Sequence, residues 1–240
     1  MRFDPALIPA TLVRRYKRFL ADVVFDSGEP ATVHVANPGA MTGLARPLSR
    51  VWLSDSGNPE RKYPLTWELV ETDLGNGPEL VGVNTGAPHQ LVAEAIAAGM
   101  IPELRGYSSV RREIRYGENS RVDFLLEEPG RPSCYLEIKN VHLMRKAGLA
   151  EFPDSVTERG AKHLRELTAM HATGARAMLL FVIQIASADR FALARDIDPA
   201  YGAAFDQASA HGVEMLAWRC DVSLSGIDIA APVPIVDGKT

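Results

Sequence analysis

The hydrophobic pattern of this sequence changes at residues 84–90, which read NTGAPHQ. Before this segment, short apolar runs alternate with segments rich in Gly, Pro, Asn and Asp, a pattern typical of short strands joined by turns. After it, apolar residues recur at helical spacing: Leu91, Val92, Ala95 and Ile96. One architecture does not fit both patterns, and we expect two domains, residues 1–86 and residues 87–240.

The first domain contains five candidate strands, which are residues 19–25, 31–36, 50–54, 67–72 and 80–84. Short strands joined by turns over such a length fit a small closed barrel, and the Greek-key barrel of the OB type is one such form. We therefore expect an OB-like β-barrel. Because barrels of this type serve many ligands, the fold alone does not assign a function.

The second domain alternates between strand and helix patterns. The expected strands are residues 110–116, 122–127, 135–141, 177–183 and 213–218. Besides the helix that contains Leu91 and Ile96, we expect two further helices, residues 156–170 and 199–210. Ser155 and Glu158 fit the S-x-x-E capping box at the start of the first of these two helices. This order predicts a mixed α/β domain in which helices cover a central sheet.

Composition and charge exclude several classes of protein. A net charge of -4 argues against a general polyanion binder, so any surface for nucleic acid must be local. The two cysteines, Cys134 and Cys220, exclude a disulfide framework and suit a reducing compartment. The longest apolar run, residues 177–183, is too short for a membrane span, and the N-terminal segment lacks a secretory pattern. We expect a cytoplasmic protein without membrane contact.

Two neighbouring strand candidates carry charged residues, in the stretch SRVDFLLEEPGRPSCYLEIKN. Glu137 and Lys139 share a face because side chains alternate along a strand, and Asp123 can face Glu137 if the two strands pair as a hairpin. Two carboxylates in an apolar setting repel each other unless a cation lies between them. Mg²⁺, or Mn²⁺ in its place, is such a cation. Lys139 would then orient or help to deprotonate an attacking water, or stabilise the charge on a phosphate under attack. This arrangement predicts metal-assisted phosphodiester hydrolysis. A salt-bridged strand pair is the alternative interpretation.

Basic residues gather in two segments. The first mixes cations with an aromatic ring, as a sequence-tolerant nucleic-acid groove requires, in Arg14, Arg15, Tyr16, Lys17 and Arg18. Its alternative interpretation is a solvated entry to the first strand, with Phe19 in the core. In the second, Arg159 and Lys162 lie on one face of the helix over residues 156–170, where they suit phosphate contacts or an ordinary solvated face. The neighbouring His163 suits a proton carrier or a buried histidine with a structural partner.

Several phrases, in order between Leu12 and Val222, resemble the sugar fermentation stimulation protein family. They are LVRRYKRFLADV, NPGAMTGL, VWLSDSGNPERKYPLTWELVE, VGVNT, SRVDFLLEE, CYLEIKNV, FPDSVTERGAKHLREL and IDPAY. The resemblance implies an OB-type barrel followed by a PD-(D/E)xK nuclease-like domain. It also implies non-specific DNA binding and a role in regulating sugar metabolism.

The resemblance places the nuclease motif on Asp123, Glu137 and Lys139, and Glu94 matches an additional acidic residue that some such nucleases use at the metal. The alternative interpretation of Glu94 is an ordinary glutamate that faces solvent. We therefore expect a DNA-binding protein with a Mg²⁺-dependent nuclease-type site, whose DNA binding is non-specific and salt-sensitive. Two alternatives stay open: a non-catalytic DNA-binding regulator that keeps the scaffold, and a barrel module for a small sugar or nucleotide.

Overall fold

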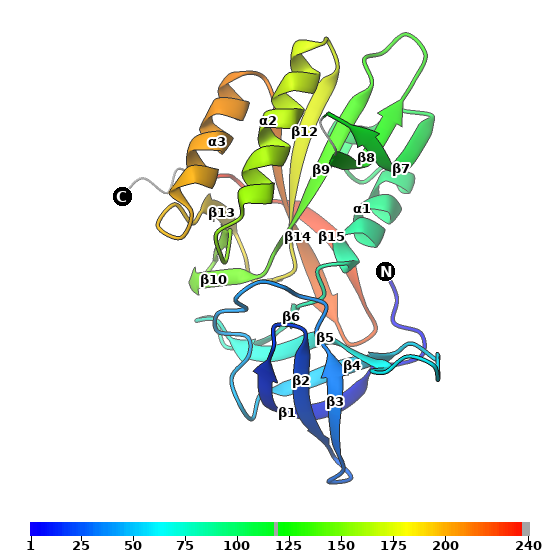
Figure 1. Ribbon diagram of the computed structural model, residues 1–240, viewed down its shortest axis with the longest axis vertical. Coiled ribbons are helices and arrows are strands. Elements are labelled where there is room, and N and C mark those ends of the chain that lie inside the picture. Colours follow the sequence, from blue (N-terminus) through cyan, green and yellow to red (C-terminus); the bar gives the residue numbers. More distant parts are fainter. Residues whose placement is uncertain (118–119, 237–240) are drawn as a thin grey trace.

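The structure is a computed structural model that describes residues 1–117 and 120–236. The last residues of the predicted second domain, 237–240, lie outside this range. A β-barrel forms one end of the molecule and an α/β domain the other (Figure 1).

Six strands form the sheet of the barrel domain, in the order β3-β2-β1-β4-β5-β6. They are β1 (Ile8–Tyr16), β2 (Leu20–Phe25), β3 (Pro30–His34), β4 (Arg50–Asp55), β5 (Leu65–Asp73) and β6 (Pro78–Gly82). His34 of β3 pairs with Thr66 of β5, which closes the first five strands into a barrel. The predicted OB-like barrel is confirmed, although β1 was missed and β6 lies outside the closed ring.

Six strands form the main sheet of the α/β domain, in the order β15-β14-β12-β9-β8-β7. They are β7 (Ser109–Tyr116), β8 (Ser120–Glu127), β9 (Cys134–Val141), β12 (Arg176–Ile183), β14 (Glu214–Ser223) and β15 (Gly226–Pro232). The central strand β12 runs parallel to β9 and β14, whereas the other pairs are antiparallel. The predicted mixed sheet is confirmed.

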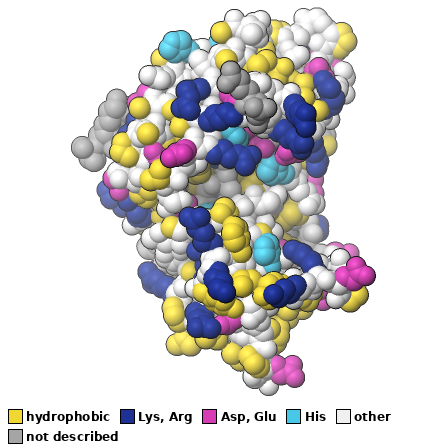
Figure 2. Space-filling model, in the orientation of Figure 1, with side chains coloured by type: hydrophobic (Ala, Val, Ile, Leu, Met, Phe, Trp, Pro, Cys, Tyr) yellow, Lys and Arg dark blue, Asp and Glu magenta, His cyan; other side chains and the backbone are white. Residues whose placement is uncertain are grey.

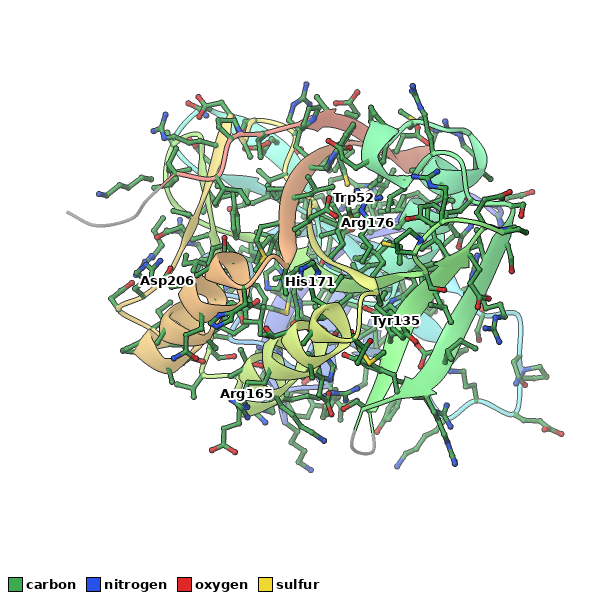
Figure 3. The ribbon with its side chains drawn as sticks, turned by 90° about the horizontal axis from the view of Figure 1, so that it is seen from above. Trp52, Tyr135, Arg165, His171, Arg176 and Asp206 are labelled. Atoms are coloured by element: carbon green, nitrogen blue, oxygen red, sulfur yellow. The ribbon has the colours of Figure 1, made fainter. Side chains whose placement is uncertain are left out.

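Helices cover both faces of this sheet. One face holds α1 (Ala87–Ala97), and the other holds α2 (Glu158–Ala172) and α3 (Pro199–Ala210), as Figure 3 shows from above. Leu179 and Phe181 of β12 pack on the side of α2 and α3, in a core that also contains Leu12 and Val33 of the barrel. The hydrophobic core is therefore continuous between the two domains. No helix within the described ranges combines the length and the apolar character of a membrane span.

Short elements complete the α/β domain and were not predicted. They are the 3-10 helix η1 (Pro102–Leu104) and a small sheet of β10 (Leu143–Lys146), β11 (Leu149–Phe152) and β13 (Arg190–Leu193). The predicted capping box of α2 is wrong. Thr157 is the N-cap, because its Oγ1 accepts the Gly160 N–H at 3.0 Å, whereas Ser155 Oγ donates to Asp154.

Candidate metal centre

The predicted acidic residues meet where β8 separates from β9. Leu125 lies opposite Tyr135 in the antiparallel ladder, and the same register two residues further brings Asp123 opposite Glu137, on the same face. The ladder has already ended there, and Asp123 Oδ2 instead accepts the Ile138 N–H at 2.6 Å. The Asp123 carboxylate is therefore fixed between the two strands.

Glu137 is buried, with 2% of its surface exposed. Its Oε1 accepts a hydrogen bond from Lys139 Nζ at 2.7 Å and also contacts His163 Nδ1. Burial alone would raise the pKa of Glu137, but Lys139 and His163 bring it below its usual range. Its Oε2 has no partner among the described residues, and a buried oxygen of this kind suits a cation ligand.

His163 connects this carboxylate to the basic face of α2. Arg159 Nε donates to His163 Nε2 at 3.3 Å, so the other ring nitrogen carries the hydrogen that faces Glu137. The interpretation of His163 as a buried histidine with structural partners agrees with its exposed fraction of 5%. On the same helix, Lys162 Nζ lies 3.6 Å from Glu166 Oε1.

Two residues that sequence reasoning missed lie beside Asp123. His89 Nε2, from α1, is 3.0 Å from Asp123 Oδ1 and 4.0 Å from Glu113 Oε1, and one ligand atom of each residue lies within 4.8 Å of the others. The hydrogen bond to Asp123 raises the pKa of His89. Glu113 has a left-handed φ of 54° within β7, a conformation that costs about 1–3 kcal/mol in a non-glycine residue and is frequent at functional sites.

Glu94 does not join this group. Its carboxylate lies 2.5 Å from the Met1 amino group and accepts a hydrogen bond from Gln90 at 2.9 Å. Glu94 follows His89 by five positions in the helix, a rotation of about 140° around the axis of α1. The helix that turns His89 towards Asp123 therefore turns Glu94 away, and the structure gives the predicted metal role of Glu94 no support.

The predicted basic segment, residues 14–18, spans the end of β1 and the turn after it, and its residues differ in their surroundings. Arg14 pairs with Asp22 at 2.8 Å and lies over the ring of Tyr16, whose hydroxyl donates to the same Asp22. Among the described residues, the hydrogen bonds of the Arg15 guanidinium go to backbone carbonyls, where Arg15 supports the local structure. Lys17 and Arg18 are exposed, and their side chains have no hydrogen bond or ion pair within the described residues.

Lys and Arg side chains lie on both sides of a hollow between the two domains (Figure 2). A cavity of about 400 Å³ beside the acidic residues is lined by Glu113, Ser120, Arg121, Arg159, Lys162 and His163. A second cavity, of about 350 Å³, lies between Arg18 of the barrel and the segment before α2. The structure thus brings the predicted Arg159 and Lys162 into one cavity with Glu113 and His163, and places Arg18 at the second cavity.

Comparisons with known proteins agree with this architecture. Residues 13–83 match the SfsA N-terminal OB domain, and residues 86–226 match the sugar fermentation stimulation protein RE domain. A sugar fermentation stimulation protein homolog from Azorhizobium caulinodans is 57% identical over 236 residues, which cover 98% of this chain and 100% of that protein. The homolog from Rhodospirillum centenum is 58% identical over 229 residues, covering 95% and 97% of the two chains.

A solved structure has the same fold. Pyrococcus furiosus SfsA, in complex with Ca²⁺, superimposes with a TM-score of 0.87 at 25% identity, and the match covers 98% of both chains. Since two family models match most of the chain and both relatives share more than half of its residues, the chain belongs to the sugar fermentation stimulation protein family, with an OB domain followed by an α/β domain.

Proposed function

We propose that this chain binds nucleic acid and carries a divalent-metal-dependent phosphodiesterase site of the PD-(D/E)xK type. The observation that carries the proposal is the unpartnered, buried Oε2 of Glu137, in register with Asp123 on the neighbouring strand. A buried carboxylate oxygen without a donor is costly unless a cation or water satisfies it. The Ca²⁺ complex of the Pyrococcus furiosus relative supports a divalent ion in this family.

The residues present fit a divalent ion. Asp123 and Glu137 offer the carboxylate oxygens that Mg²⁺ prefers, and Glu113 adds a third carboxylate within reach of Asp123. The imidazole of His89 suits Mn²⁺ and other transition metals better than Mg²⁺. Asp123 and Glu137 would hold the ion, and a further ligand would come from His89 or Glu113, which lie beside Asp123. When bound, it would neutralise a phosphate under attack and activate water.

The protein's own cations would position the substrate. The Lys139 side chain is 13% exposed and lies 2.7 Å from Glu137, where its ammonium can hydrogen-bond an attacking water or a phosphate oxygen. Arg121, Arg159 and Lys162 line the adjacent cavity and suit the flanking phosphates. Contacts to phosphates carry no base information, so we propose DNA binding without sequence preference that weakens as salt rises.

Cleavage and binding assays test this proposal. The purified chain is incubated with single- and double-stranded oligonucleotides and Mg²⁺ or Mn²⁺, and we expect cleavage. Lys139→Ala should lower the rate by about 100-fold or more while binding is retained, because it removes one charge-stabilising donor. Lys146→Ala, which changes an exposed lysine on β10, should leave the rate unchanged.

Metal binding gives an independent measurement. Mn²⁺ titration followed by electron paramagnetic resonance should show binding to the parent chain and a large loss of affinity in Asp123→Asn. Salt-sensitive binding without cleavage under either metal would contradict the enzyme and favour a DNA-binding regulator linked to sugar metabolism. Absence of oligonucleotide binding at low salt would favour a barrel module for a small ligand.

A further inference from the structure

The connection between β1 and β2 has an unusual backbone for its residues. Tyr16 pairs with Leu20, which leaves Lys17, Arg18 and Phe19 as the hairpin tip. Lys17 has a φ of 49° and Arg18 a φ of 64°. Glycine or asparagine adopts this left-handed region with less strain than a long side chain. Two cations thus occupy positions that a purely structural turn would give to smaller residues.

Several hydrogen bonds hold this tip in one conformation. The Arg15 guanidinium donates to the Arg18 carbonyl at 2.9 and 3.2 Å, and to the carbonyls of Asn37 at 2.8 Å and Gly39 at 2.9 Å. The Phe19 carbonyl accepts the Val35 N–H at 2.8 Å. A tip that is already ordered loses little conformational entropy when a ligand binds.

The hairpin tip presents an aromatic ring next to two cations. Phe19 is 47% exposed and does not lie in the core, contrary to the alternative interpretation of this segment. Lys17 and Arg18 precede it, with no partner for either side chain in the described part of the chain. Ring faces for bases and cations for phosphates are the two elements of sequence-tolerant binding to single strands.

The position of the tip connects it to the acidic residues. Arg18 lines the cavity between the domains, and the opposite wall includes Val156 and Thr157 at the start of α2. From Thr157, six residues of helix lead to His163, a rise of about 9 Å. Arg159 and Lys162 lie on this part of the helix and line the next cavity. The start of α2 therefore borders both cavities, and together they form a hollow that runs from the tip to the acidic residues.

We propose that the hairpin tip binds an unpaired nucleotide of a nucleic acid that lies along this hollow. The Phe19 ring stacks on the base, and Lys17 and Arg18 neutralise the adjacent phosphates. In an uninterrupted duplex each base face is covered by its neighbours, so the tip favours a single strand or a gap. This inference rests on the proposed function for nucleic acid as the ligand, but it does not depend on cleavage.

Binding of the full chain to a fluorescent single strand and to a duplex of equal length, measured by anisotropy in EDTA, tests the inference. Phe19→Ala should weaken single-strand binding by about tenfold and leave duplex binding nearly unchanged, because one base–ring stack is lost. Phe19→Trp should retain the affinity. The matched control is Leu224→Ala, since Leu224 is also 47% exposed and also lies in a turn between two strands. Stacking on the Phe19 ring should quench the fluorescence of 2-aminopurine placed in the single strand. This quenching should be lost in Phe19→Ala and kept in Phe19→Trp and Leu224→Ala.

The inference is overturned if Phe19→Ala binds the single strand like the parent, if it weakens both forms equally, or if the parent binds neither form at low salt. The two proposals can fail separately. If Phe19→Ala loses single-strand binding and the parent cleaves under no metal, the proposal for the hairpin tip is supported and the proposal of a phosphodiesterase is contradicted. If Phe19→Ala binds the single strand normally and Lys139→Ala loses cleavage, the proposal for the hairpin tip is contradicted and the phosphodiesterase is supported.

Discussion

Asp154 joins the two domains through its carboxylate. Oδ2 accepts the Met41 N–H from the barrel domain at 3.1 Å and lies 3.1 Å from His142 Nε2, and Oδ1 accepts from Ser155 Oγ at 3.3 Å. Burial alone would raise the pKa of Asp154, but these hydrogen bonds lower it to about 2. The folded state therefore prefers the ionised carboxylate more strongly than the unfolded state does.

Asp154→Asn should destabilise the protein in a pH-dependent way. A depressed folded-state pKa gives stabilisation that is fully present above the ordinary Asp pKa of about 4 and is lost as the pH falls through about 2. We expect a loss of about 2 kcal/mol in the free energy of unfolding at pH 7, and a smaller difference from the parent at pH 3. Urea unfolding at the two pH values measures it.

The matched control is Asp196→Asn. The hydrogen bond to Arg145 also lowers the pKa of Asp196 to about 2, but its side chain is 64% exposed. Solvent screens such surface pairs, so this variant should lose much less stability than Asp154→Asn. Equal losses in the two variants would contradict the role assigned to burial.

Single residues also show which parts of the candidate site follow from sequence. Strand alternation and one hairpin are enough to bring Asp123 and Glu137 to the same face. The approach of His89 depends on how α1 packs, and the direction of the Glu113 side chain depends on a left-handed φ of 54° that no residue type signals. Arg15 resembles a DNA ligand in sequence because several of its carbonyl partners, Asn37 and Gly39 among them, come from a loop more than twenty residues away.

Among the elements, most of those long enough to repeat their hydrophobic pattern several times were predictable, and those of only a few residues were not. The predicted helix over residues 199–210 coincides with α3. β1 was missed because its apolar and polar residues do not alternate: the apolar Leu12 and Val13 are adjacent, at a register shift in the pairing with β2. β10, β11 and β13 have four residues each, which is too short for a period to show.

The start of α2 gives a prediction at this scale. Thr157→Ala should lower the free energy of unfolding by about 1 kcal/mol, because the Gly160 N–H loses its side-chain acceptor. Thr157→Ser is the control, since it keeps a hydroxyl that can accept the Gly160 N–H. Chemical denaturation of both variants measures the two losses. An equal loss in Thr157→Ser and Thr157→Ala would contradict the capping role of the hydroxyl.

At the scale of the whole molecule, buried polar groups fix the two domains together. Gln184, which is fully buried at the end of β12, donates to the Asn84 carbonyl at 3.0 Å and to Asn140 Oδ1 at 2.6 Å. The backbone carbonyl of Gln184 accepts the Gly82 N–H of β6 at 3.0 Å. Asn140 follows Lys139 on β9, so these contacts tie the barrel to the strand that carries the acidic site. The sequence shows a polar residue after an apolar run but not the distant partners that it meets.

The continuous core and this polar interface predict that the chain unfolds as one unit. Each α-helix of the described residues lies in the α/β domain, so the far-ultraviolet circular dichroism signal of helix reports mainly on that domain. In the double variant Trp52→Phe/Trp218→Phe, the remaining tryptophan, Trp67, lies on β5 and reports on the barrel, whereas Trp52 packs among residues of the α/β domain. The two signals should give the same urea midpoint in this variant, because residues of both domains share one core. A barrel transition at a lower urea concentration than the helix transition would show that the domains unfold independently, and the interface would then contribute little to stability.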